Sequence, residues 1–446
     1  MVLRPKPPPP LEQLLDTLTW FLDLRHKELL EPLFLGLLFA QGRRTATAWF
    51  RAAGIADDFR RGYTLLGTIG RNKIDSFATV LFSHLRRSID PGQRWVFGID
   101  DSPTERYGPC VEGAGIHHNP TPGPTNQHHL YGHVWVTLAW LVCHPSWHVR
   151  ALPLLAELYI RQVDIPKIDA DRRPTFATKL QMAAKQITWT AQQLRGSELP
   201  IWFVVDGAYI KRPVLKAARQ EQVIVVGRLR CDAALWDLPP LVAQNQRGPG
   251  RPRSYGRHRM SLAGRAAHQK GWQEVECCQY QETVTKTVKT FLATWKPAGG
   301  VIRVVIVKEQ DGWIAYACTD PDATVKDILE AVAARTAIED TFKDVKEVEG
   351  AGEQQLRYWR ANVGALNFCL WGYTAVEWWA WDKRSEEVCD RSASPWDKEE
   401  RRPSHADKRK ALQAEMLQTE FWRCWGERPC PPKIRELLEA VLAMAV

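Results

Sequence analysis

The sequence predicts an α/β protein with a helical N-terminal region and a strand-rich insertion. Three observations support this fold class. Residues 11–92 have helical periodicity with few strand signals, short apolar runs alternate with helical segments from residue 93 onward, and residues 273–318 are again strand-like. A period of 3.6 residues is typical of amphipathic helices, whereas short β-branched and aromatic runs are typical of buried strands.

The N-terminal region begins with a proline-rich, extended segment at residues 1–10. Short helices are expected next, separated by glycine-containing breaks, at residues 30–40, 45–53 and 56–66. This arrangement favours a helix-turn-helix, with Thr45 as a helix cap and Arg43 and Arg44 near DNA phosphates. The alternative is a helical bundle that only packs against the rest of the protein.

Two predicted strands end in aspartate. The strands of this region are expected at residues 94–100, 133–143, 147–153, 200–206 and 222–228, and its helices at 172–195 and 211–220. The first strand ends at Asp100, with Asp101 next to it, and the fourth ends at Asp206. Open α/β folds place their sites where the strands end, so these carboxylates are expected to lie close together.

A charged helix near residue 340 supplies a third acid. Glu339 lies four residues after Arg335 and seven before Lys346, with Lys343 between, so all four share one side of a helix. Such a helix is often only a solvated surface. If Glu339 meets the two strand-end aspartates, however, the three anions need a cation, and Mg²⁺ or Mn²⁺ suits clustered oxygen ligands. The implied chemistry is two-metal phosphodiester cleavage and transfer.

In these residues the chain resembles the DDE transposases of bacterial insertion sequences, in the branch with a Tyr-Arg-Glu-Lys signature. Arg335, Glu339 and Lys346 stand at the signature's spacing, while Val332 replaces its tyrosine. Asp206-Gly-Ala-Tyr209 is similar to the second aspartate motif, and the resemblance covers roughly residues 35–375.

The resemblance implies a ribonuclease-H-like mixed sheet with flanking helices and a β-rich insertion between the second aspartate and the glutamate. It implies two Mg²⁺ (or Mn²⁺) ions held by Asp100, Asp206 and Glu339. Asp100 is favoured as the first acid because apolar-Asp-x-Ser matches the family's first strand, and Asp101 stays open as the alternative. Arg335, Lys343 and Lys346 would clamp phosphates, and Arg357 matches an element expected to hold a DNA strand.

The implied function is a transposase that cuts the ends of its insertion sequence and joins the element to target DNA. Its partners would be double-stranded DNA, both terminal inverted repeats and target, and a second copy of the chain, as a homodimer on the DNA ends. Two alternatives stay open. One is a catalytically inactive DNA-binding repressor of the same fold, and the other is a metal-dependent nuclease without strand transfer.

The expected domains follow from these assignments. They are a helical DNA-binding domain at 1–92, a first part of the catalytic core at 93–229, a β-rich insertion at 230–322, the closing core helices at 323–382, and a charged linker with a C-terminal helix at 383–446. The insertion contains Gly-Arg251-Pro-Arg253, similar to the minor-groove core of an AT-hook. The alternative is a flexible loop that contacts phosphates.

Composition agrees with a DNA-binding protein that is not in a membrane. The formal net charge is +9, which favours a polyanionic partner. No apolar run approaches the roughly 18 residues of a membrane span, the N-terminus does not resemble a signal peptide, and the ten cysteines include no CxxC pair. The expected location is the bacterial cytoplasm, in association with the nucleoid.

A cluster of histidines between His117 and His148 suggests a rival metal site. His129 and His133 are four residues apart, and Cys110 and Cys143 could complete a zinc site. The alternative, which we favour, places these histidines in the loop beside the first aspartate, with His133 approaching the metal site.

Overall fold

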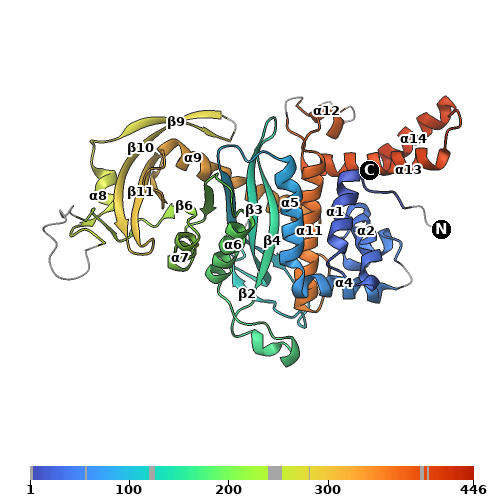
Figure 1. Cartoon of the computed structure of the whole chain (residues 1–446), viewed down its shortest axis with the longest axis horizontal. Helices are drawn as coiled ribbons and strands as arrows, with labels where there is room; N and C mark the ends of the chain where they lie inside the picture. The colour runs from blue at the N-terminus through green and yellow to red at the C-terminus, as the bar shows by residue number, and fades with distance from the viewer. Residues whose placement is uncertain are drawn as a thin grey trace.

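A computed structural model describes residues 4–55, 58–119, 126–239, 254–280, 282–391, 396–398 and 401–445. The molecule is elongated, with a strand-rich end and a helical end that contains both termini (Figure 1). Arg251 and Arg253 of the predicted AT-hook lie outside the described residues.

The central sheet has the order β4-β3-β1-β5-β6. These strands are β1 (Trp95–Glu105), β3 (His129–His144), β4 (His148–Tyr159), β5 (Ile201–Val205) and β6 (Ile224–Leu229). β3 runs antiparallel to both β1 and β4, whereas β5 runs parallel to both β1 and β6. The short β2 (Gly115–His118) pairs with the N-terminal end of β3. This mixed sheet is compatible with a ribonuclease-H-like fold.

The strand-rich insertion extends the central sheet instead of forming a separate one. Its strands are β7 (Leu235–Trp236), β8 (Arg259–Met260), β9 (Gln273–Gln279), β10 (Glu282–Trp295), β11 (Gly300–Glu309) and β12 (Gly312–Cys318). β12 pairs antiparallel with β6, so twelve strands of the described residues make one continuous sheet. The sequence predicted that the insertion is strand-rich. It did not predict that the insertion continues the core sheet.

The core and the insertion contain the next group of helices. They are α6 (Lys179–Gln193), α7 (Arg212–Gln220), α8 (Leu262–Ala267), α9 (Val325–Ala334), α10 (Thr336–Glu347) and α11 (Trp359–Trp379). Thr178 and Gln181 form a capping box at the start of α6, and Thr324 caps α9. α10 begins directly after α9, with only Arg335 between them. Short 3-10 turns, η1 (Ile165–Lys167) and η2 (Ala170–Arg172), connect β4 to α6.

The N-terminal region is helical, as predicted. It contains α1 (Pro9–Thr19), α2 (Leu24–Phe39), α3 (Ala46–Ala52), α4 (Phe59–Asn72) and α5 (Ile74–Ser88). The Thr45 hydroxyl accepts a hydrogen bond from the Ala48 N–H, which is the predicted cap of α3. α3 is only seven residues long, and its Trp49 and Phe50 are fully buried.

These N-terminal helices pack closely on the core. A Cβ atom at Gly70 of α4 would lie 1.8 Å from the Arg360 carbonyl oxygen of α11, so the two backbones touch where both helices carry glycine, the second being Gly364. Both helices belong to one hydrophobic cluster that reaches the central sheet. One side of α3 is thus used for packing, whereas Arg51 on the same helix is exposed, and DNA binding by this region stays a prediction.

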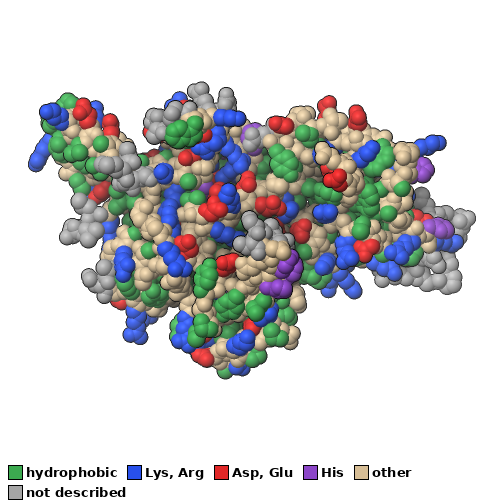
Figure 2. Space-filling model, turned by 180° about the vertical axis from the view of Figure 1, so that it is seen from behind, with side chains coloured by type: hydrophobic (Ala, Val, Ile, Leu, Met, Phe, Trp, Pro, Cys, Tyr) green, Lys and Arg blue, Asp and Glu red, His purple; other side chains and the backbone are tan. Residues whose placement is uncertain are grey.

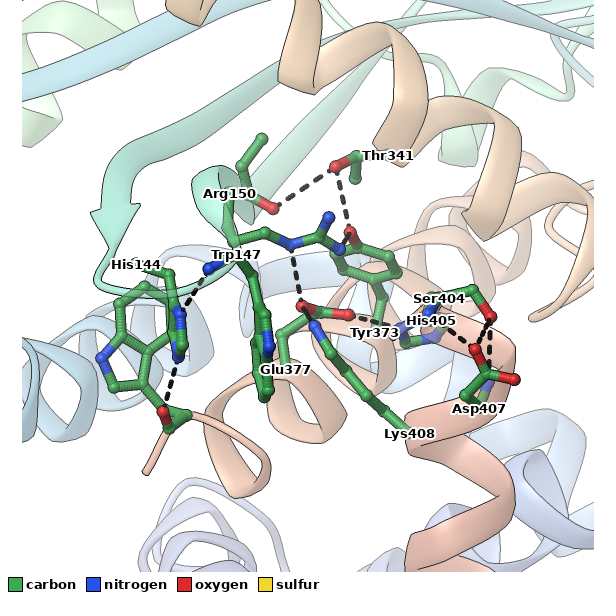
Figure 3. Close-up of polar contacts among 12 residues, drawn as sticks. His144, Trp147, Arg150, Thr341, Tyr373, Glu377, Ser404, His405, Asp407 and Lys408 are labelled. Atoms are coloured by element: carbon green, nitrogen blue, oxygen red, sulfur yellow. Dashed lines mark hydrogen bonds and ion pairs between the residues drawn. The ribbon is translucent and has the colours of Figure 1, made fainter. Parts of the chain in front are cut away.

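The C-terminal segment contains α12 (Ser385–Val388), α13 (His405–Trp425) and α14 (Pro432–Ala445). The sequence predicted a charged linker or a loose helix at residues 383–410. α13 begins inside that stretch, and its charged residues His405, Lys408 and Arg409 are buried. They are buried because acids from other elements neutralise them, as Figure 3 shows for Glu377 of α11. None of the described helices is long and apolar enough to cross a membrane.

Candidate functional site

Asp100 and Asp206 lie side by side on neighbouring strands. β1 and β5 are parallel, with Ile99 opposite Val205, so the next residues along the two strands are Asp100 and Asp206. Residues in register on adjacent strands point to the same face of a sheet. That face is covered by α10, because a Cβ atom at Gly98, two residues before Asp100, would lie 2.1 Å from Ile338 Cδ1.

Arg335 links Asp100 to the third predicted acid. At the junction of α9 and α10, its Nη1 donates to Asp100 Oδ2 at 2.6 Å and its Nη2 donates to Glu339 Oε1 at 2.8 Å. The Asp100 side chain is 16% exposed, whereas that of Glu339 is 57% exposed. The guanidinium is thus a cation held between two of the three predicted acids.

The environment of Asp100 disfavours an uncompensated charge. Burial raises the pKa of Asp100 to about 6, and the negative charges of Asp101 and Asp206 add to this rise. Arg335 and the N–H of Asp101, which donates to Asp100 Oδ1 at 2.8 Å, only partly oppose it. Adjacent carboxylates that need more positive charge than one arginine supplies are a suitable donor set for Mg²⁺ or Mn²⁺.

The described residues contain no ready-made metal cluster of three His, Cys, Asp or Glu side chains. At the predicted site, Arg335 holds Asp100 and Glu339 instead. A divalent ion there would therefore replace the guanidinium between these two carboxylates. The residue types and their shared face fit such an ion, and the assignment of the three acids as metal ligands stays a proposal.

Asp101 has a different set of partners. Its Oδ2 accepts a hydrogen bond from Lys179 Nζ at 2.6 Å, and its Oδ1 accepts one from the Tyr209 hydroxyl at 2.7 Å. Lys179 opens α6, and Tyr209 is the last residue of the Asp-x-x-Tyr motif. Successive residues of a strand point to opposite faces, so Asp101 points away from α10. Asp100, and not Asp101, therefore shares a face with Asp206 and α10, and its assignment as the first metal ligand stays a proposal.

The predicted phosphate-binding cations are spread over several surfaces. Lys343 is exposed on α10, whereas Lys346 is half-buried beside Ser102 and Thr104, and burial lowers the pKa of Lys346. Arg357 is exposed in a separate groove with Tyr107. The structure brings together Arg335 and the acids, but it does not gather these other cations around them.

The two N-terminal arginines differ in their contacts. Arg43 is exposed. The backbone N–H of Arg44 donates to Glu353 Oε2 at 2.7 Å, and its Nη1 donates to the Gly42 carbonyl at 2.8 Å. The Arg44 side chain also covers Gly350. Arg44 thus ties the N-terminal helices to the core, and its predicted role in DNA binding stays a prediction.

The histidine cluster forms no metal site in the part of the chain that the structure describes. His133 is fully buried, where its Nδ1 accepts from Arg106 Nε at 3.2 Å and its Nε2 contacts the Glu112 carbonyl at 2.9 Å. Burial, helped by the Arg106 charge, lowers the pKa of His133 to about 3. The expectation that His133 approaches the metal site is wrong, because both ring nitrogens serve the core. Cys110 and Cys143 are exposed, free thiols.

Two residues near the site were not predicted from the sequence. Lys179 was missed because it lies 78 positions from Asp101 in the chain. Arg228, exposed on β6, lines a cleft of about 400 Å³ together with Asp206 and Trp313. Arg228 lies near the end of β6, which is parallel to β5. Because neighbouring parallel strands end at the same edge of a sheet, this position could have indicated that Arg228 lies near Asp206.

The comparison with protein families agrees with this geometry. Residues 21–296, more than half of the chain, match the model of the DDE superfamily endonucleases. The chain therefore belongs to this family. The matched segment contains Asp100 and Asp206 and ends before Glu339. The comparison with curated proteins finds no match.

Proposed function

We propose that this chain is a transposase that cuts DNA at the ends of its element and joins the element to target DNA. The observation that carries the proposal is the placement of Asp100 beside Asp206 on one face of the sheet, with Glu339 joined to Asp100 through Arg335. Membership of the DDE superfamily endonucleases supports the hydrolytic half of this activity. The finer assignment rests on the Arg335, Glu339 and Lys346 spacing.

Asp100, Asp206 and Glu339 would hold two Mg²⁺ or Mn²⁺ ions, which when bound activate water or a 3′-hydroxyl and stabilise the leaving oxygen of an in-line displacement. The chain's own residues have three tasks. The carboxylates must be ionised and converge. Arg335 must leave them and present its two N–H groups to a phosphate, which a guanidinium binds in a bidentate manner. Lys179 and Tyr209 must hold Asp101 fixed, so that the neighbouring Asp100 keeps its direction.

The proposed partners are double-stranded DNA, as terminal repeats and as target, and a second copy of the chain on paired ends. Basic side chains support a DNA partner. The net charge is +9, and Lys and Arg side chains gather on the lower part of the strand-rich end seen from behind (Figure 2). Such a protein would work on the bacterial nucleoid.

A nuclease without strand transfer is the second candidate, because the matched family is described by endonuclease activity alone. The products of the reaction separate the two. Joined DNA requires strand transfer, whereas a nuclease leaves nicks or breaks. A DNA-binding repressor of the same fold would leave the DNA intact.

The test is excision and joining of a marker flanked by the DNA that borders this gene, with Mg²⁺ present. Wild type is compared with Asp206→Asn and Glu339→Gln, and with Glu347→Gln as a matched control. Glu347 is an exposed carboxylate on the same helix, α10, so its loss changes the charge equally without touching the site. We expect joined products from wild type and Glu347→Gln and none from the other two variants.

Other results would revise the proposal in distinct ways. Cut but unjoined DNA from wild type would identify a nuclease. Bound but uncut DNA would identify a repressor. Joining by Glu339→Gln at the wild-type rate would remove Glu339 from the site.

A further inference from the structure

The outer face of α7 carries three cations in helical register. Arg212, Lys216 and Arg219 are exposed, and their spacing of four and three residues places them on one side of the helix. The opposite side buries apolar residues, including Val214 and Leu215, against the sheet. Packing therefore explains the inner face of α7 but not why its outer face is basic.

A groove lies between this face and the turn that joins β10 to β11. It has a volume of about 470 Å³ and is lined by Arg212, Lys216, Arg219 and Tyr255, together with Lys296 and neighbouring residues of the turn. Arg219 Nη1 donates to the Gly299 carbonyl at 3.5 Å, and Lys296 Nζ lies 5.7 Å from the centre of the Trp236 ring. None of the described residues that line it is a carboxylate.

The four cations lack ion-pair partners among the described residues. The groove beside Tyr107 is different, since its Arg161 and Lys167 both contact the buried carboxylate of Asp164, at 2.6 and 2.8 Å. Four like charges along one groove repel one another unless an anion lies between them. The α7 groove therefore calls for an anion that the described part of the chain does not supply, and the Tyr107 groove does not.

The position of the groove indicates which anion fits. α7 begins six residues after Asp206, so Arg212 is the groove residue nearest to Asp206 in the chain. At about 1.5 Å per residue, Arg212 to Arg219 spans about 10 Å. Successive phosphates of a DNA strand are farther apart than the axial rise of about 3.4 Å, and a row of this length still reaches more than one phosphate.

We propose that the groove formed by Arg212, Lys216, Arg219 and Lys296 binds the phosphate backbone of duplex DNA on the Asp206 side of the site. The proposal rests on the proposed function for its setting, and it adds a second, sequence-independent contact surface. Lysine and arginine contacts to phosphates position a duplex without reading its sequence. The groove thus suits DNA that varies in sequence, such as target DNA.

The test measures binding to a 30-base-pair duplex of arbitrary sequence in EDTA, at several salt concentrations, with the full chain carrying Glu339→Gln. The groove variant adds Arg212→Gln, Lys216→Gln and Arg219→Gln. A matched control adds Lys410→Gln, Arg428→Gln and Lys433→Gln, which removes three exposed cations far from α7 in the chain. Thermal unfolding confirms that both variants are folded, and a single strand and an RNA duplex of the same length are measured alongside.

The logarithm of the binding constant decreases linearly with the logarithm of the salt concentration. We expect the magnitude of this negative slope to be smaller by about 2 to 3 for the groove variant, at about 0.9 per lost phosphate contact. The control is expected to keep the parent slope within about 1. Equal slopes for the two variants would overturn the inference, and so would a loss confined to RNA or to the single strand. These assays contain no metal, so failure of cleavage would count against the proposed function alone.

Discussion

The buried carboxylate of Glu377 and the carboxylate of Asp100 differ in how many cations neutralise them. Glu377 is 1% exposed and is saturated by three cations: Arg150 Nε at 3.0 Å, His405 Nδ1 at 3.0 Å and Lys408 Nζ at 2.6 Å (Figure 3). Asp100 shares the single guanidinium of Arg335 with Glu339. The pKa of Glu377 is accordingly held well below its usual range, whereas that of Asp100 is raised to about 6.

The difference separates a structural cluster from the site where we propose that metal replaces Arg335. Glu377 joins β4, α11 and α13, and every cation around it comes from the chain itself. Asp100 lacks that saturation and faces solvent in part, next to a second acid. An external cation can bind at carboxylates, such as Asp100, that the chain's own cations neutralise only in part.

The largest expected effect is on stability. Glu377→Gln should lower the free energy of unfolding by about 3–5 kcal/mol, because it leaves buried Arg150 and Lys408 without their counter-charge. Asp100→Asn should leave that free energy unchanged or raise it by up to about 2 kcal/mol, because it removes a destabilised carboxylate. Denaturant unfolding in EDTA measures both variants. A larger loss for Asp100→Asn than for Glu377→Gln would refute the comparison.

The second prediction concerns pH. His405 is fully buried between Glu349 and Glu377, and hydrogen bonds to both acids raise the pKa of His405. The charged imidazolium therefore contributes stability that is complete below its unfolded pKa of about 6.5 and is lost as the pH rises through the raised folded value. At pH 6, His405→Gln should cost about 2–3 kcal/mol.

Unfolding of wild type and His405→Gln over pH 6–9 tests this sign. The gap between the two curves should narrow as the pH rises. A gap that stays constant or widens as the pH rises would mean that His405 is neutral in the folded protein.

The third prediction concerns Arg335. Arg335→Ala should slow DNA cleavage by about 100-fold through the lost phosphate contact, which is worth about 3 kcal/mol. The same change should tighten Mn²⁺ binding, because the ion no longer competes with a guanidinium for Asp100 and Glu339. Electron paramagnetic resonance of free Mn²⁺ measures the affinity. Arg335→Lys, which keeps the charge, is the control and should bind Mn²⁺ more weakly than Arg335→Ala.

The smallest effect is expected at Tyr209. Tyr209→Phe removes the hydroxyl that donates to Asp101 but keeps the buried ring, so it should cost about 1 kcal/mol of stability. Activity should fall by less than about 10-fold, because Lys179 still holds the other Asp101 oxygen. If Tyr209→Phe abolished cleavage as completely as Asp206→Asn, Asp101 would have to be reconsidered as the first acid.

Local patterns predicted the strands, the helices and the order of the acids. Each apolar run that ends in aspartate became a strand of the central sheet, and the β1–β5 register placed Asp100 beside Asp206. The helical period placed Glu339 within reach of Arg335. These features depend on residues that are close in sequence or on a rule about where parallel strands end.

Features that depend on distant partners were not predictable. The stretch containing His405 and Lys408 is charged, and nothing local shows that Glu349 and Glu377 lie ready to neutralise it. The pairing of β12 with β6, which merges the insertion with the core sheet, also joins residues far apart in the chain. His133 was expected to approach the metal site because nothing local shows that its partner is Arg106, which directly follows β1.

We propose that Asp100, Asp206 and Glu339 together hold divalent metal. Titration of Mn²⁺ against the protein bound to DNA from the borders of its gene, read by electron paramagnetic resonance, tests it most directly. We expect two ions per chain for wild type and Glu347→Gln, and fewer for Asp206→Asn and Glu339→Gln. Equal Mn²⁺ binding by all four proteins would contradict the claim.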